Sequence, residues 1–170
     1  MTLAVEIRRI QERDASAFRE LRLAALRTDP AAFGSTEARE AAYADEHWAA
    51  WARRGSLEAR EATFVAAEPT GTLVGMFGAF AMDDRPQLWG MWVRPSARGR
   101  GIGGRLLEAV LEWAGRAFPG APARLEVNPE QAEAVRIYLA RGFAFTGHEE
   151  PLGHHPPAIV REMVRPPDGP

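Results

Sequence analysis

The segment VRPSARGRGIGGRLL, residues 93–107, joins a strand-like apolar run to a helix-like run through a turn rich in glycine and arginine. Glycine allows a backbone to approach a ligand closely, and the first amides of a helix have no acceptor within the helix. Together with the positive end of the helix dipole, such amides form a binding site for phosphate groups. The segment therefore predicts a strand–turn–helix unit that holds a pyrophosphate.

Two phosphate-binding fingerprints fit these letters. Gly99, Gly101 and Gly104 match G-x-G-x-x-G, the fingerprint of dinucleotide-binding proteins, whereas Arg98, Gly101 and Gly103 match R-x-x-G-x-G. The first fingerprint normally opens a series of βαβ units. Here it follows strands that look like antiparallel hairpins, and little sequence remains for further units. We therefore favour the second fingerprint and keep an NAD-binding protein as an alternative.

Composition limits the classes of partner. The chain has 170 residues with 21 basic and 23 acidic side chains, so it has no overall field that would attract nucleic acid. It contains neither cysteine, which removes disulfides and thiolate chemistry, nor lysine, which removes Schiff-base chemistry. No apolar run has the length of a signal peptide or a membrane span. We expect a cytoplasmic protein with no membrane partner.

The pattern along the chain predicts one mixed α/β domain over residues 1–165, followed by a disordered tail at 166–170. Its sheet has six or seven strands, with helices on both faces. We expect strands at 5–10, on both sides of a turn at 68–71, and at 86–93, 124–127, 143–147 and 158–165, and helices from Asp14, over 36–53, 101–118 and 129–141. Apolar residues of the first helix share one face: Phe18, Leu21, Ala25 and Leu26.

A second motif follows the glycine turn by about thirty residues. The run QAEAVRIYLARGF, residues 131–143, places Gln131, Ala134 and Tyr138 on one face of the last helix, and Gly142 is suited to end that helix. Asn128 and Pro129 precede the run at positions that favour an N-cap and a first helical residue. The helix follows a strand that we expect beside the strand that enters the glycine turn.

With both motifs in this order, the sequence resembles the GCN5-related N-acetyltransferase (GNAT) superfamily, whose motifs are R/Q-x-x-G-x-G/A and N-x-x-A-x-x-x-Y-x-x-x-G-F. The resemblance extends over nearly the whole chain, although Gln131 replaces the usual asparagine. It implies a GNAT fold in which two parallel strands splay apart around acetyl-CoA. The residues that it implies for binding this cosubstrate are Met91, Trp92, Val93, Arg98, Gly99, Arg100, Gly101, Ile102, Gly103, Gly104, Gln131, Ala134 and Tyr138.

The resemblance also implies direct transfer of acetyl from acetyl-CoA to a primary amine in a ternary complex, with Tyr138 as general acid for the departing thiolate. The amine acceptor, a small molecule or a peptide, is not readable from the sequence. Some relatives carry a catalytic glutamate on the strand before the loop, where this chain has Gln87. A non-catalytic acyl-CoA sensor is therefore a second alternative. The base is unassigned among water and the acids Glu126, Asp83, Asp84, Glu149 and Glu150.

Three histidines and three aromatic residues are further candidates for a functional site. The histidines lack the spacing and the acidic partners of a metal site, so we predict no bound metal. Three aromatic residues belong either to the core or to the acceptor site, which lies near the first helices and the last hairpin in this family. Exposed tryptophans would also suit a homodimer. The histidines are His148, His154 and His155, and the aromatic residues are Phe33, Trp48 and Trp51.

Overall fold

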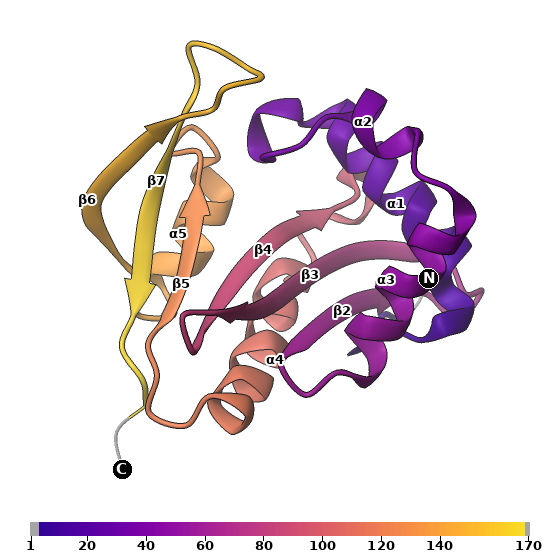
Figure 1. The fold of residues 1–170 in the computed structure, drawn as a ribbon, viewed down its shortest axis with the longest axis horizontal. Helices are drawn as coiled ribbons and strands as arrows, with labels where there is room; N and C mark the ends of the chain where they lie inside the picture. The colour runs from indigo at the N-terminus through magenta and orange to yellow at the C-terminus, as the bar shows by residue number, and fades with distance from the viewer. Residues whose placement is uncertain (1–3, 169–170) are drawn as a thin grey trace.

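The computed structural model describes residues 4–168, which form one seven-stranded sheet in the order β1-β2-β3-β4-β5-β7-β6 (Figure 1). Residues 169–170 of the predicted tail lie outside this range. The strands are β1 (Glu6–Arg9), β2 (Glu61–Ala67), β3 (Leu73–Met82), β4 (Arg85–Val93), β5 (Ala123–Val127), β6 (Ala144–Pro151) and β7 (Ile159–Arg165). The helices are α1 (Ala15–Thr28), α2 (Glu37–Ala41), α3 (Asp45–Leu57), α4 (Ile102–Ala117) and α5 (Ala132–Leu139).

Alternation along the central strands divides the core between the two faces of the sheet. Phe77 of β3 packs with α4 on one face, while its neighbour Met76 packs with α1 and α3 on the other. Phe64 and Val65 of β2 divide in the same way. Figure 1 shows α4 behind the sheet, and α1 to α3 on the right of the view, near the N-terminus of the chain. The expected mixed sheet with helices on both faces is confirmed.

The sheet splays between β4 and β5. Strands β1 to β4 form an antiparallel meander, and β4 and β5 are parallel but pair only at Gln87 and Arg124. Beyond this pair the two strands diverge toward Val93 and Val127 (Figure 1). Because the meander is antiparallel, the glycine turn does not open a series of βαβ units. The fold therefore counts against the NAD-binding alternative.

The predicted helix over 36–53 is two helices, α2 and α3. The first helix ends at Ala41, directly after Glu40, whose carboxylate turns inward to Arg22 of α1. Tyr43 then packs its ring 4.1 Å from that of His47, and α3 turns Trp48 into the core. Burial of an ion pair and a tryptophan from one segment thus breaks a helix that local propensity would continue.

Two expected helix caps use their side chains elsewhere. Asp14 is the residue before α1, but its carboxylate pairs with Arg8 at 2.6 Å and accepts the Gln11 N–H at 2.8 Å. The residue before α5 is Gln131, and not Asn128. Asn128 accepts the Glu130 N–H at 2.9 Å and closes a turn ahead of the helix, which is why α5 begins three residues later than predicted.

Candidate functional site

The splay opens into a cleft with a volume of about 460 Å³. This volume is within the usual range for a small-molecule site. Both sequence motifs contribute to its walls, because the glycine turn and α4 follow β4, and α5 follows β5. Every residue predicted to bind acetyl-CoA lines the cleft except Arg100. The predicted residues in the lining are Met91, Trp92, Val93, Arg98, Gly99, Gly101, Ile102, Gly103, Gly104, Gln131, Ala134 and Tyr138.

The glycine turn has the backbone that its sequence predicts. Gly99 and Gly101 have φ of +74° and +71°, in the left-handed region that glycine adopts without strain, and a Cβ atom on either would meet no atom within 4 Å. The first intrahelical bond of α4 runs from Arg105 N to Gly101 O. The amides of Ile102 and the two glycines after it therefore have no acceptor within the helix and are suited to phosphate oxygens.

Gly103 sits at a narrow point of the cleft. A Cβ atom on this residue would lie 3.0 Å from Ile137 Cδ1 of α5 and 3.9 Å from Met91 Sδ of β4. The residue is helical, so its backbone does not require glycine. Its missing side chain instead keeps the space between α4, α5 and β4 open.

The side chain of Arg98 is committed to protein partners. Its Nε donates to Val93 O at 2.9 Å, and its Nη2 donates to Asp29 Oδ2 at 2.8 Å. Asp29 Oδ2 also accepts the Trp92 indole N–H at 2.7 Å. Arg98 thus fastens the glycine turn to the end of β4 and to the segment after α1. Two donors of the guanidinium are thus engaged within the protein, while the amides of the turn are available for an anion.

Residues 29–32 connect both sides of the splay, a role that sequence analysis missed. Asp29 contacts β4 and the glycine turn, and Asn128 at the end of β5 donates its Nδ2 to Ala31 O at 3.0 Å. His154 Nε2 lies 3.3 Å from Pro30 O. The only sequence signal is an Asp-Pro pair after a helix, which predicts a turn but none of these distant partners.

Tyr138 is buried beside the cleft. Only 5% of the residue is exposed, and its ring centroid lies 5.7 Å from that of Phe143 and 6.2 Å from that of Phe77. Burial raises the pKa of its phenol above the ordinary value for tyrosine. Among residues 4–168 its hydroxyl has no hydrogen-bond partner. Tyr138 therefore keeps its proton and is free to donate it to a ligand in the cleft.

The five acids that the sequence offered as candidate bases differ in whether they line the cleft. Asp83 and Asp84 form the β3–β4 hairpin turn, with φ of +49° and +57°, and the two acids of β6 are ion-paired, Glu149 with Arg161 and Glu150 with His148. None of these four residues lines the cleft. Only the fifth candidate does, and it is Glu126 of β5.

Glu126 is also the unpaired acid of the cleft. The other acids in the lining are Asp29, which binds Arg98, and Glu133, which binds Arg136 at 2.5 Å. Within the described part of the chain, the Glu126 carboxylate has neither a hydrogen bond nor an ion pair. An exposed, uncompensated carboxylate at the mouth of the cleft attracts a cation or accepts a proton.

The aromatic residues that sequence analysis left open belong to the core. Trp48 and Phe33 are buried, and Trp51 stacks on Trp48 with ring centroids 5.5 Å apart. Residues 4–168 contain no cluster of three or more His, Cys, Asp or Glu side chains placed to hold a metal ion. Over the same range, no helix is both long and apolar enough to cross a bilayer.

Comparison with known proteins agrees with the geometry of the cleft. The profile of the Acetyltransferase (GNAT) family matches residues 18–143. The chain belongs to the GNAT acetyltransferase family. This family uses acetyl-CoA, and the two motifs that carried the resemblance, residues 98–103 and 131–143, lie within the matched range. The family assignment supports an enzyme over the NAD-binding alternative.

A curated relative and two solved structures illustrate the similarity. An IAA acetyltransferase of Azospirillum brasilense is 37% identical over 102 residues, which are 58% of this chain and 65% of that protein. A GNAT acetyltransferase of Streptococcus pneumoniae has a TM-score of 0.82 at 21% identity, over 97% of this chain and 100% of that one. The putative acetyltransferase yncA of Salmonella typhimurium, solved with acetyl-CoA, has a TM-score of 0.78 at 19% identity, over 98% and 96%.

Proposed function

We propose that the protein transfers an acetyl group from acetyl-CoA to a primary amine by direct attack in a ternary complex. One observation supports this most strongly: the glycine turn, the buried phenol of Tyr138 and the unpaired carboxylate of Glu126 all line a single cleft at the splay. The turn fits a pyrophosphate because its glycines leave open space and the first amides of α4 lack acceptors. The end of β4, residues 91–93, presents backbone beside that turn.

The side chains divide the proton transfers between them. Glu126 takes a proton from the acceptor ammonium, directly or through water, so that the amine nitrogen carries a free electron pair. The nitrogen attacks the thioester carbonyl, and a backbone N–H of residues 91–93 donates a hydrogen bond to the developing oxyanion. As the C–S bond breaks, Tyr138 gives its proton to the departing thiolate. After the attack the nitrogen carries one proton more than the amide product needs, and this proton passes through water to the Tyr138 phenolate and restores the phenol. Glu126 releases its proton to solvent, so the reaction ends with the acetylated amine, the CoA thiol and one free proton.

Amine-dependent release of the CoA thiol tests this assignment. Glu126→Gln is expected to lower kcat/KM by roughly 10²–10⁴-fold at neutral pH. Part of that loss should be recovered at high pH, where the amine is already unprotonated. Tyr138→Phe should lower kcat by a similar factor while acetyl-CoA still raises the melting temperature. Glu130→Gln is the matched control, because Glu130 is exposed on the same segment and does not line the cleft.

The non-catalytic alternative predicts a different result. A sensor would bind acetyl-CoA but release no thiol with any amine. Neither Glu126→Gln nor Tyr138→Phe would then change the rate of thiol release. A double-reciprocal plot of rate against both substrates separates direct transfer from a covalent acyl-enzyme. We expect intersecting lines, whereas parallel lines would contradict a ternary complex.

A further inference from the structure

The open face of the sheet beside Glu126 carries a row of polar side chains that the proposed reaction does not use. Gln87 of β4 pairs with Arg124 of β5, Glu126 stands opposite Glu162 of β7, and side chains two residues apart on a strand share a face. We call the face defined by these four residues the acceptor face. Leu125, between Arg124 and Glu126, belongs to the core on the opposite side of the sheet.

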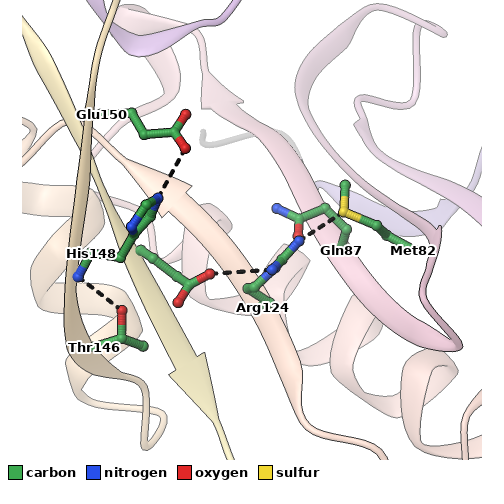
Figure 2. A network of polar contacts seen from close by, with 7 residues as sticks. Met82, Gln87, Arg124, Thr146, His148 and Glu150 are labelled. Atoms are coloured by element: carbon green, nitrogen blue, oxygen red, sulfur yellow. Dashed lines mark hydrogen bonds and ion pairs between the residues drawn. The ribbon is translucent and has the colours of Figure 1, made fainter.

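Arg124 is fixed in this row by groups from three other strands. Its Nε donates to Gln87 Oε1 at 2.8 Å, its Nη2 contacts Met82 Sδ at 2.7 Å, and its Nη1 lies 3.3 Å from Glu162 Oε2. Figure 2 shows Arg124 beside Gln87 and Met82. The side chains of Arg124 and Glu162 are only 28% and 18% exposed, so solvent screens this pair less than a surface pair.

The pairing leaves one uncompensated negative charge on the face. Glu162 is neutralised by Arg124, and at the edge of the sheet Glu150 lies 2.9 Å from the ring of His148 (Figure 2). The hydrogen bond to Glu150 raises the pKa of His148, and the charges of Glu162 and Glu126 act in the same direction. Without Arg124, Glu126 and Glu162 would present two neighbouring carboxylates, since facing residues of antiparallel strands have side chains about 5 Å apart.

Apolar groups border the row on its β3 side. Phe80 pairs with Gln87 across the β3–β4 hairpin, and Met82 is two residues further along the same strand. Their exposed fractions are 36% and 37%. A ligand that lies along the face from Glu126 toward β3 passes the Arg124 guanidinium and then meets apolar surface. A second ammonium group on such a ligand would be repelled by Arg124 and would lie beside the apolar side chains of Phe80 and Met82.

We propose that Arg124 is a specificity-determining residue and that the acceptor is a primary amine with one positive charge and an uncharged, largely apolar remainder. The inference rests on the proposed acetyl transfer, and it concerns the charge of the acceptor rather than the chemistry. Hexylamine and 1,6-diaminohexane test it as a matched pair, because they share a six-carbon chain and differ in the number of ammonium groups. The wild-type protein should prefer hexylamine by about tenfold in kcat/KM. This is the size expected for one unfavourable contact, between the second ammonium and the Arg124 guanidinium, in a partly solvated site.

Two variants test the role of Arg124 itself, through the change that each causes in the ratio of kcat/KM for the two amines. Arg124→Gln frees Glu162, so the hexylamine-to-diaminohexane ratio should fall by about tenfold. The double variant Arg124→Gln with Glu162→Gln removes both the repelling guanidinium and the freed carboxylate, so its ratio should lie between those of the wild type and of Arg124→Gln. Arg161→Gln is the control, because Arg161 pairs with Glu149 and alternates onto the opposite side of the sheet from Glu162, and it should leave the ratio unchanged.

The failures are distinguishable. If neither amine releases thiol from acetyl-CoA in the wild-type protein, the proposed function fails, and this inference fails with it. If transfer occurs but the wild type prefers the diamine, the inference is wrong and the proposed function stands. If Arg124→Gln lowers kcat/KM equally for both amines, Arg124 only supports the sheet, and its role in specificity is refuted.

Discussion

Replacing Glu40 by glutamine should be among the most destabilising single changes in the N-terminal half. Arg22 and Glu40 form two hydrogen bonds of 2.8 Å between α1 and α2, and their side chains are only 8% and 4% exposed. Arg22 Nη1 is buried without a partner, and three aromatic rings, of Phe33, Trp51 and Trp89, lie 5.0–5.7 Å from the guanidinium carbon. Glutamine keeps one acceptor oxygen but removes the charge.

The expected loss is about 3 kcal/mol, the lower end of the range for leaving one member of a buried pair uncompensated. The lower end applies because the rings continue to stabilise the cation, by roughly 0.5–2 kcal/mol per favourable contact. For a chain of this length, 3 kcal/mol corresponds to a fall in Tm of roughly 6–12 °C. Arg22 Nη1 would lie 3.3 Å from a Cβ on Gly90, a residue that lines the cleft, so the same change should loosen β4 at the site.

Urea unfolding of Glu40→Gln measures this loss, and the chain supplies a matched control. Arg27 and Glu37 also connect α1 to α2, but their side chains are 66% and 36% exposed, so Glu37→Gln should cost less than about 1 kcal/mol. The double change Arg22→Met with Glu40→Leu should be less destabilising than Glu40→Gln alone, since it removes both charges. Equal losses for Glu40→Gln and Glu37→Gln would refute the reasoning.

Asp14→Asn should lower stability more at pH 7 than at pH 2. Burial acts to raise the pKa of Asp14, yet hydrogen bonds and the charge of Arg8 outweigh burial and lower the pKa. The ionised carboxylate therefore stabilises the fold above the unfolded pKa of about 3.9, and this stabilisation is lost as pH falls through the folded pKa. Urea unfolding at both pH values measures the difference. Gly78→Ala should cost about 1–3 kcal/mol and shift tryptophan emission, because its Cβ would overlap the indole of Trp89. Because burial raises the pKa of Tyr138, the ultraviolet difference between wild type and Tyr138→Phe should contain no phenolate signal at the ordinary tyrosine pKa of about 10. A phenolate signal at that pH would mean that Tyr138 is solvated.

The sequence best predicts those parts of the site that are formed by contiguous residues. The glycine turn and the helix that carries Tyr138 each depend on contiguous residues, so their spacing defines them before any fold is known. Their position beside each other followed from the order of strands. The cleft lining contains almost the whole predicted set for this reason.

Sequence analysis failed where distant partners compete with local preference. Asp14 and Asn128 have the residue types of helix caps, but Arg8 and the Ala31 carbonyl engage their side chains instead. The break between α2 and α3 depends on Arg22, eighteen residues before Glu40. Such pairings leave no periodic pattern in the sequence.

The choice among the acids required the same information about distant partners. Nothing in the letters marks Glu126, rather than Glu149, as the acid that lines the cleft. Only the structure pairs Glu149 with Arg161 and leaves Glu126 unpaired at the cleft. The assignment of a base is therefore a consequence of tertiary contacts, and not of the motif.

Calorimetric titration with acetyl-CoA, compared with NAD, tests most directly whether the splay binds the acetyl donor. Gly103→Val would fill the narrow part of the cleft, whereas Gly115→Val changes an exposed position of the same helix where a Cβ meets nothing within 4 Å. We predict one acetyl-CoA site in the wild type and in Gly115→Val, affinity weakened at least about tenfold in Gly103→Val, and no binding of NAD. Binding of NAD in place of acetyl-CoA, or equal acetyl-CoA affinity in all three proteins, would contradict the account.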